Sequence, residues 1–146
     1  MRLLRSYKEF SRLSEYTHSL SLLLARIAVA YGFYEPAMMK WSDIHSVAQW
    51  FGSMGIPLPT LNAYLAATTE VLGVLFLVLG LFTRLISIPL MIIMVVAILT
   101  VHLSNGFSAG ANGFEIPLYY LLFLFIFFAH GAGKFSLDHL LFEKKS

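Results

Sequence analysis

Four long apolar runs constrain this chain more than any other feature. They cover about residues 20–39, 61–82, 85–103 and 116–129. A helix that spans the hydrocarbon core of a bilayer needs about 20 residues, and the first three runs meet that length. Within lipid, only helices and closed β-barrels satisfy the hydrogen bonds of all backbone N–H and C=O groups. These runs lack the alternation of apolar and polar residues that barrel strands show. The sequence therefore predicts an all-α fold, an integral membrane four-helix bundle.

The composition agrees with this prediction. Hydrophobic residues make up 58% of the chain and charged residues 12%, whereas soluble domains are nearer half apolar and about a quarter charged. A length of 146 residues favours one domain, so residues 1–146 are expected to form a single transmembrane unit. The net charge of +2 gives no reason to expect a nucleic-acid partner, and the absence of cysteine excludes disulfides, iron–sulfur clusters and thiolate metal sites.

Positive charge is distributed unevenly along the chain. The loops 40–60 and 104–115 together hold only Lys40, and Arg26 lies inside the first run. The other eight cations flank the runs at Arg2, Arg5, Lys8, Arg12, Arg84, Lys134, Lys144 and Lys145. Because cytoplasmic segments carry the excess of Lys and Arg, both termini are expected in the cytoplasm and both loops outside. Three further apolar runs follow the first, so the first is interpreted as a retained helix and not as a signal peptide.

Two ionisable residues lie within the apolar runs and are the leading site candidates. Arg26 belongs to the first run and Glu70 to the second. Charges at membrane depth face protein or water and usually pair. The face of the second run that holds Glu70 also carries small residues, which mark helix contacts in membranes; these are Ala63, Ala66, Ala67 and Gly73. The pattern predicts an Arg26–Glu70 salt bridge, which either holds the helices together or takes part in binding or proton transfer.

Three more residues complete the candidate set. His102 ends the third run and Glu115 precedes the fourth, and the glycine-rich loop between them could bring the two together. With Glu70 below, they are expected to form a polar pocket open to the outer face, unless they are simply polar groups at the membrane interface. Glu35 is the fifth candidate, although an unbroken helix places it opposite Arg26.

The remaining polar residues are interpreted as solvated groups near the interface. This group contains Lys40, Asp43, His45 and His130. Histidine, glutamate and methionine can bind copper or zinc, but no compact ligand spacing such as HxxxH occurs, and methionines in apolar helices usually serve packing. The sequence therefore predicts no dedicated metal site.

The order of several short motifs resembles the DoxX family over about residues 20–140. The matching stretches are Leu24-Ala25-Arg26 running to Tyr31-Gly32-Phe33 and Met39-Lys40, then Glu70-Val71-Leu72-Gly73 and Leu79-Gly80-Leu81-Phe82-Thr83-Arg84, then His102, Asn105-Gly106-Phe107 and Gly113-Phe114-Glu115, and finally Gly131-Ala132-Gly133-Lys134-Phe135-Ser136-Leu137-Asp138. The resemblance implies a four-helix protein of the bacterial inner membrane. It also implies a relationship to the small subunits of thiosulfate:quinone oxidoreductase and to redox assemblies with sulfurtransferase-like or superoxide-dismutase-like partners.

The resemblance favours one function and leaves two others open. The favoured reading is a membrane subunit of a quinone-linked oxidoreductase or redox-protection complex, with a quinone head group near Arg26, Glu70 and His102. The chain has no P-loop, dinucleotide fingerprint or haem motif, so a protein partner is expected to supply the electrons. The alternatives are a non-catalytic membrane anchor or assembly factor, and a small-solute or metal-handling membrane protein. The sequence sets no oligomeric state.

Overall fold

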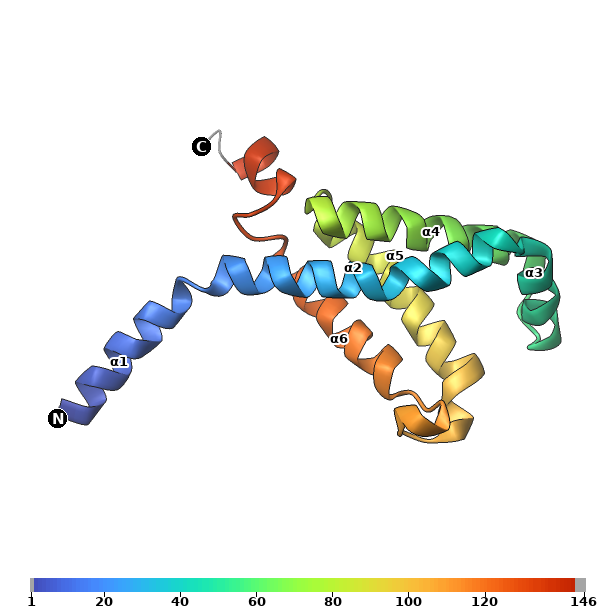
Figure 1. Ribbon diagram of the computed structural model, residues 1–146, viewed down its shortest axis with the longest axis horizontal. Helices are drawn as coiled ribbons and strands as arrows, with labels where there is room; N and C mark the ends of the chain where they lie inside the picture. The colour runs from blue at the N-terminus through green and yellow to red at the C-terminus, as the bar shows by residue number, and fades with distance from the viewer. Residues whose placement is uncertain (1, 144–146) are drawn as a thin grey trace.

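The computed structural model describes residues 2–143, and helices dominate them (Figure 1). The α-helices are α1 (Arg2–Glu15), α2 (His18–Ser42), α3 (Ile44–Ser53), α4 (Pro59–Leu79), α5 (Thr83–Ala97) and α6 (Glu115–His130). Short π and 3-10 turns cover Ile98–His102, Leu103–Asn105, Ala109–Ala111 and His139–Glu143. No strand occurs among these residues, which confirms the predicted all-α class. Lys144 and Lys145, counted above for orientation, lie outside the described residues.

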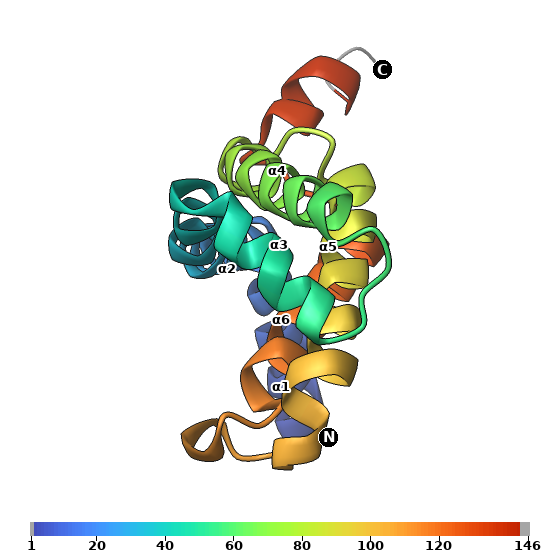
Figure 2. The ribbon, with the colours of Figure 1, turned by 90° about the vertical axis from the view of Figure 1, so that its right-hand side faces the viewer.

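The helices form a compact body with one projecting arm. Helices α2 and α4 lie side by side, and α5 and α6 form a second pair that crosses them (Figure 1). Helix α3 folds across the end of the α2–α4 pair (Figure 2), and α1 leads away from the body. The core between the two pairs is mostly apolar, with Val29, Phe33, Leu77, Leu90, Leu124 and Phe127 almost completely buried.

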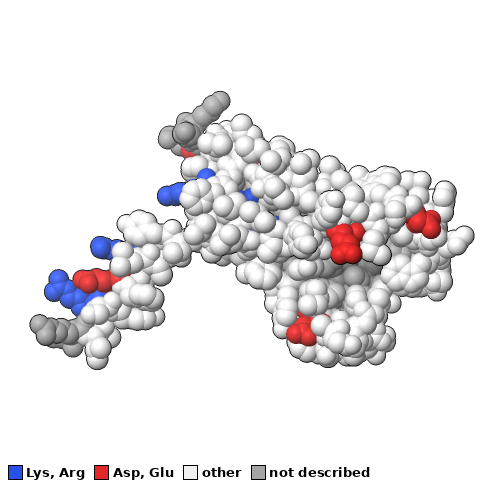
Figure 3. Space-filling view, in the orientation of Figure 1, with Lys and Arg blue, Asp and Glu red and all other residues white. Residues whose placement is uncertain are grey.

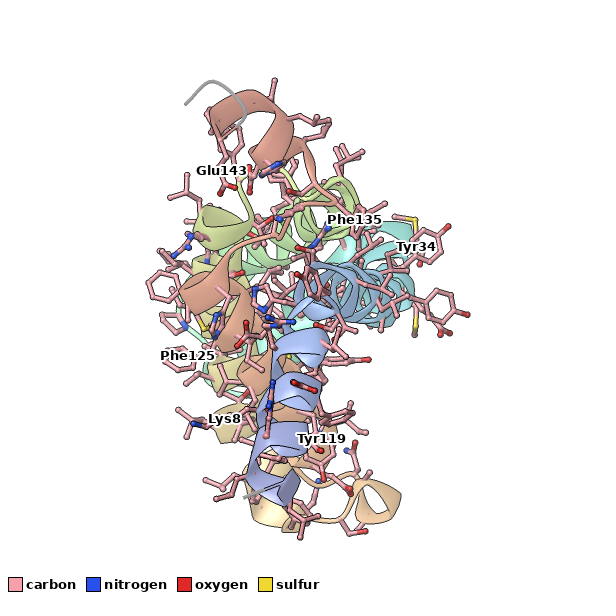
Figure 4. The ribbon with its side chains drawn as sticks, turned by 90° about the vertical axis from the view of Figure 1, so that its left-hand side faces the viewer. Lys8, Tyr34, Tyr119, Phe125, Phe135 and Glu143 are labelled. Carbon is pink, nitrogen blue, oxygen red and sulfur yellow. The ribbon has the colours of Figure 1, made fainter. Side chains whose placement is uncertain are left out.

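The outside of the body is largely apolar as well. Tyr34 and Phe125 point outward on opposite sides (Figure 4). On the face in Figure 3, Lys and Arg gather on α1 and near the C-terminal segment, and the body carries only isolated acidic patches. Within residues 2–143, Pro59–Leu79 and the helical run Thr83–Asn105 are long and apolar enough to cross a bilayer, and Glu115–His130 is apolar but shorter. Helix α2 has sufficient length but carries three charged residues.

The C-terminal segment closes one end of the body. Helix α4 ends at Gly80, whose φ of +66° is the left-handed conformation typical of glycine after a helix. Asp138 then accepts hydrogen bonds from the backbone N–H groups of Phe82 (2.7 Å) and Thr83 (3.0 Å), where α5 begins. A carboxylate at a helix start satisfies N–H groups that the helix leaves without partners. Asp138 is therefore a capping residue supplied from a distant part of the chain.

Helix α3 occupies much of the segment that the sequence analysis assigned to an outward loop. Asp43 begins it by accepting hydrogen bonds from the Ser46 hydroxyl (2.6 Å) and the Ser46 backbone N–H (3.1 Å). This is the usual N-cap arrangement. The helix turns the chain back over the ends of α2 and α4, which places the aromatic rings of Trp50 and Phe51 beside the site described below.

The Asp43 cap should make the docking of α3 sensitive to acid. The hydrogen bonds from the Ser46 hydroxyl, and then from its N–H, lower the pKa of Asp43. A carboxylate whose pKa is lower in the folded state stabilises the fold above its unfolded pKa of about 3.9, and this stabilisation is lost as the pH falls through the lowered pKa. We expect Trp fluorescence to report loosening of α3 in this acidic range. Asp43→Asn keeps a capping side chain and should remove that transition; an unchanged titration curve would contradict this assignment.

Candidate functional site

A cavity of about 800 Å³ lies between α2, α3, α4 and α5. Most of its wall is apolar. Besides the aromatic rings of Trp50 and Tyr120, the side chains with polar or charged groups on it are Lys40, Asn62, Thr69, Glu70, Thr100 and His102. Small-molecule sites commonly have volumes of about 300–1,000 Å³ and a few polar groups on an apolar wall. This cavity is therefore the best candidate for a ligand site in the described residues.

Glu70 and Lys40 form an ion pair on the wall of this cavity. The Lys40 Nζ lies 2.9 Å and 3.1 Å from the two carboxylate oxygens of Glu70. The Glu70 side chain is 3% exposed and that of Lys40 19%. Lys40 is in the last turn of α2, where a lysine can extend to water; here it reaches into the cavity instead. The interpretation of Lys40 as a solvated interfacial group is therefore wrong.

Arg26 is not the partner of Glu70, so the predicted Arg26–Glu70 salt bridge is wrong. The Arg26 side chain is completely buried and donates to backbone carbonyls. Its Nη1 binds the carbonyl oxygen of Leu77 at 2.6 Å, and its Nη2 binds that of Phe135 at 2.6 Å. The last carbonyls of a helix lack intrahelical partners and attract cations. Arg26 thus satisfies the end of α4 and fastens the C-terminal segment to it, away from the cavity.

His102 lies on the cavity wall at the end of a π-helical turn. The turn covers Ile98–His102, and the N–H of Leu103 closes it by bonding to the carbonyl of Ile98. The Nδ1 of His102 lies 2.9 Å from the carbonyl oxygen of Asn112. A carbonyl oxygen only accepts, so Nδ1 carries the proton in this contact and Nε2 of the neutral ring keeps a lone pair. His102 can therefore accept a proton or a hydrogen bond through Nε2.

A second cavity of about 220 Å³ adjoins the first. Four residues line both cavities: Met94, Ala97, His102 and Tyr120. The Tyr120 hydroxyl lies so close to Gly32 that a Cβ at this position would clash with it. Glycine at position 32 thus makes room for the Tyr120 ring, which, together with His102, separates the two spaces.

Glu115 and Glu35 occupy different positions from the cavity residues. The Glu115 carboxylate accepts from the backbone N–H of Ala109 at 2.9 Å and from the Tyr119 hydroxyl at 3.3 Å. It therefore organises the loop before α6. Glu35 is exposed on α2, which runs unbroken through Pro36. Of the five candidates, the structure brings Glu70 and His102 to one cavity and leaves Arg26, Glu115 and Glu35 elsewhere.

The first cavity has a wall that also faces the outside of the body. Leu65 of α4 and Ile92 and Val96 of α5 line it while remaining 54%, 59% and 41% exposed. Toward the other end of these helices, Gly73 and Leu90 are in close contact, since a Cβ at Gly73 would lie 2.8 Å from the Leu90 side chain. Helices α4 and α5 thus meet tightly at one end and leave apolar access to the cavity at the other.

Sequence reasoning missed Lys40 and Tyr120. The sequence did contain a signal for Lys40. Lys40 follows Arg26 by fourteen residues, roughly four helical turns, so the two side chains lie on the same face of α2, and that face points into the protein. Tyr120 had no such signal among the aromatic residues of α6. Within residues 2–143, no three histidine or acidic side chains lie close enough to share a metal ion.

Comparisons with known proteins identify relatives of this chain. The family model described as DoxX matches residues 21–103. An "Uncharacterized protein" of Haemophilus influenzae is 32% identical over 129 residues, covering 83% of each chain. "Putative oxidoreductase CatD" of Bacillus subtilis is 32% identical, covering 84% of this chain and 88% of CatD. "Inner membrane protein YphA" of Escherichia coli is 40% identical over 63 residues, covering 43% of this chain and 45% of YphA. No solved structure matches.

Proposed function

This chain belongs to the DoxX family of membrane proteins, and from that premise we propose that it is a multi-pass protein of the bacterial inner membrane that binds a quinone beside Glu70. Helices α2, α4, α6 and the α5 run with its π turn form the membrane-spanning bundle of this proposal. The distribution of Lys and Arg supports cytoplasmic termini. The name of YphA, an inner membrane protein, supports the same location.

The observation that carries the proposal is the Lys40–Glu70 pair on the wall of a large, mostly apolar cavity. A quinone head group is an apolar ring with two carbonyl oxygens, and its long tail is apolar. Lys40 has donors that can reach a carbonyl oxygen, and His102 offers a second polar contact. The exposed wall formed by Leu65 and Ile92 lets an apolar tail leave the cavity into lipid. These residues fit a lipid-soluble ligand better than a water-soluble one.

The proposed role is that of a membrane subunit in an oxidoreductase or redox-protection complex. Reduction of a quinone takes up two electrons and two protons, with one proton added to each carbonyl oxygen. The electrons come from a partner protein, because this chain has no cysteine and no haem motif. Lys40, Glu70 and His102 position the head group and exchange its protons, which is the usual task of such side chains. The name of CatD, which describes an oxidoreductase, supports this class of reaction.

Ligand retention tests the proposal. Purified protein should carry quinone that solvent extraction and mass spectrometry detect, and it should bind an added short-chain quinone. Ala66→Phe fills the cavity from α4 without removing a polar group, and it should abolish binding. His102→Ala should weaken binding by about tenfold, since one hydrogen bond to a ligand contributes about 1–1.5 kcal/mol.

Glu35→Gln provides the matched control. It alters an exposed carboxylate on the same bundle that does not line the cavity, so quinone binding should stay unchanged. Folding of each variant is checked by thermal unfolding in detergent. Well-folded wild-type protein that neither retains nor binds quinone would contradict the proposal and return the choice to a non-catalytic anchor or a solute- or metal-handling protein.

A further inference from the structure

Helix α1 has two chemically different faces. Leu3, Tyr7 and Phe10 follow one another at intervals of four and three residues, which places them on one side of the helix. Arg5, Lys8 and Arg12 follow one another at intervals of three and four residues and lie roughly opposite. A helix with this division is built to lie along a boundary between an apolar and an aqueous phase.

The apolar face of α1 is uncovered. Leu3, Tyr7 and Phe10 are 87%, 69% and 67% exposed. The helix projects from the body (Figure 1), and Lys8 extends sideways from it (Figure 4). Exposed apolar stripes of this kind mark sites of interaction with a partner or a membrane. At fourteen residues α1 is too short to cross a bilayer.

The position of α1 in the chain selects the partner. A short turn at Tyr16 and Thr17 joins it directly to α2, so its C-terminal end lies at the boundary where the bundle enters the membrane. The C-terminal segment also exposes large apolar side chains, Leu140, Leu141 and Phe142. Lys and Arg gather at this end of the molecule (Figure 3). Exposed apolar side chains with Lys and Arg close to them are what an anionic lipid surface binds: the apolar groups enter the acyl region and the cations contact the headgroups.

We propose that α1 lies in the interface of the leaflet at this end of the bundle, with Leu3, Tyr7 and Phe10 in the acyl region and Arg5, Lys8 and Arg12 toward anionic headgroups. The helix then acts as a surface anchor that extends sideways from α2. No residue of α1 lines the quinone cavity, so this placement of the helix does not depend on whether a quinone binds.

Single-cysteine labelling tests this arrangement, because the natural chain has no cysteine. Spin labels are attached to full-length variants in lipid nanodiscs that hold one copy each and contain phosphatidylglycerol. The apolar set is Leu3→Cys, Tyr7→Cys and Phe10→Cys, and the polar set is Arg5→Cys, Lys8→Cys and Arg12→Cys. Tyr34→Cys and Ser108→Cys calibrate lipid-exposed and water-exposed positions. Labels are then exposed to oxygen, which concentrates in lipid, and to a water-soluble nickel chelate.

The apolar set should collide with oxygen several-fold more, relative to nickel, than the polar set. Lys8→Gln is combined with the label at Phe10→Cys. It should lower the ratio of membrane-bound to detached α1 by about fivefold, since one cation near an anionic surface contributes about 1 kcal/mol. The same variant should have little effect in phosphatidylcholine. Equal exposure of both sets to the nickel chelate in one-copy discs would overturn the proposal. If the apolar set were protected from the chelate only in discs that hold two copies, the apolar face of α1 would bind a second copy of the chain and not lipid.

Discussion

Replacement of Arg26 by leucine is expected to lower the free energy of unfolding by about 3–5 kcal/mol. The change removes the donors that serve the buried carbonyl oxygen of Leu77 and the partly buried one of Phe135, and each buried polar group without a partner costs about 1–3 kcal/mol. Loss of the buried stem adds a packing defect. Relief of the desolvation of the guanidinium offsets part of the loss, so the effect stays below the sum of these contributions.

Unfolding in detergent measures this loss, and cleavage by trypsin at the exposed Lys134 reports release of the C-terminal segment. Arg84→Leu is the matched control. The Arg84 Nη1 also serves the end of a helix, through the carbonyls of Ala129 (2.9 Å) and Phe128 (3.2 Å), but at an exposed position where water can replace it. We expect it to cost at most about 1 kcal/mol. Equal losses of unfolding free energy for the two variants would contradict the role of Arg26 in holding the C-terminal segment against α4.

Breaking the Lys40–Glu70 pair should have an effect of similar size. Glu70→Leu leaves an ammonium group in an apolar cavity, and Lys40→Met leaves a carboxylate that is almost fully buried. Removal of one partner of a buried ion pair typically costs about 3–5 kcal/mol. The double variant removes both charges, and we expect it to recover most of the stability, because well-packed apolar replacements of such pairs are often neutral.

A double-mutant cycle in detergent measures the coupling between the two side chains. Strictly additive losses would show that the pair contributes nothing to the fold. The double variant also separates structure from function. It should fold, yet fail to bind a short-chain quinone, because no charge remains on the cavity wall beside Thr69. Binding at wild-type strength by this variant would remove Lys40 and Glu70 from the proposed site.

The local sequence pattern is sufficient to predict where helices form, but it does not predict which buried charged side chains pair with one another. Apolar runs and periodicity predict helical segments because both depend on neighbouring residues. Helical spacing of apolar and charged residues also marks α1 in residues 2–15, although this arm has no apolar run. The N-cap signal of Asp43 likewise marks α3, although the sequence analysis treated the segment as a loop.

The partners of the buried cations depend on contacts that no local pattern contains. Arg26 binds Phe135, which lies 109 residues further along the chain, and it uses a backbone carbonyl, a group that every residue has. A lysine near the end of a helix can extend either to water or into the protein, and the local sequence around Lys40 does not distinguish the two. Pairing Arg26 with Glu70 matched charges by sign and depth. The structure instead matches Arg26 to the end of a helix dipole, which leaves Glu70 for Lys40.

The π-helical turn at residues 98–102 holds one residue more than an α-helical turn would between the body of α5 and His102. A chain one residue shorter here can close this widened turn to an α-helical one, which leaves the residues that follow pointing in nearly the same direction. The imidazole would then stay on the cavity wall and near the Asn112 carbonyl. Among relatives of this chain, a one-residue deletion between Val96 and His102 should therefore be compatible with the same site wherever a histidine is still aligned.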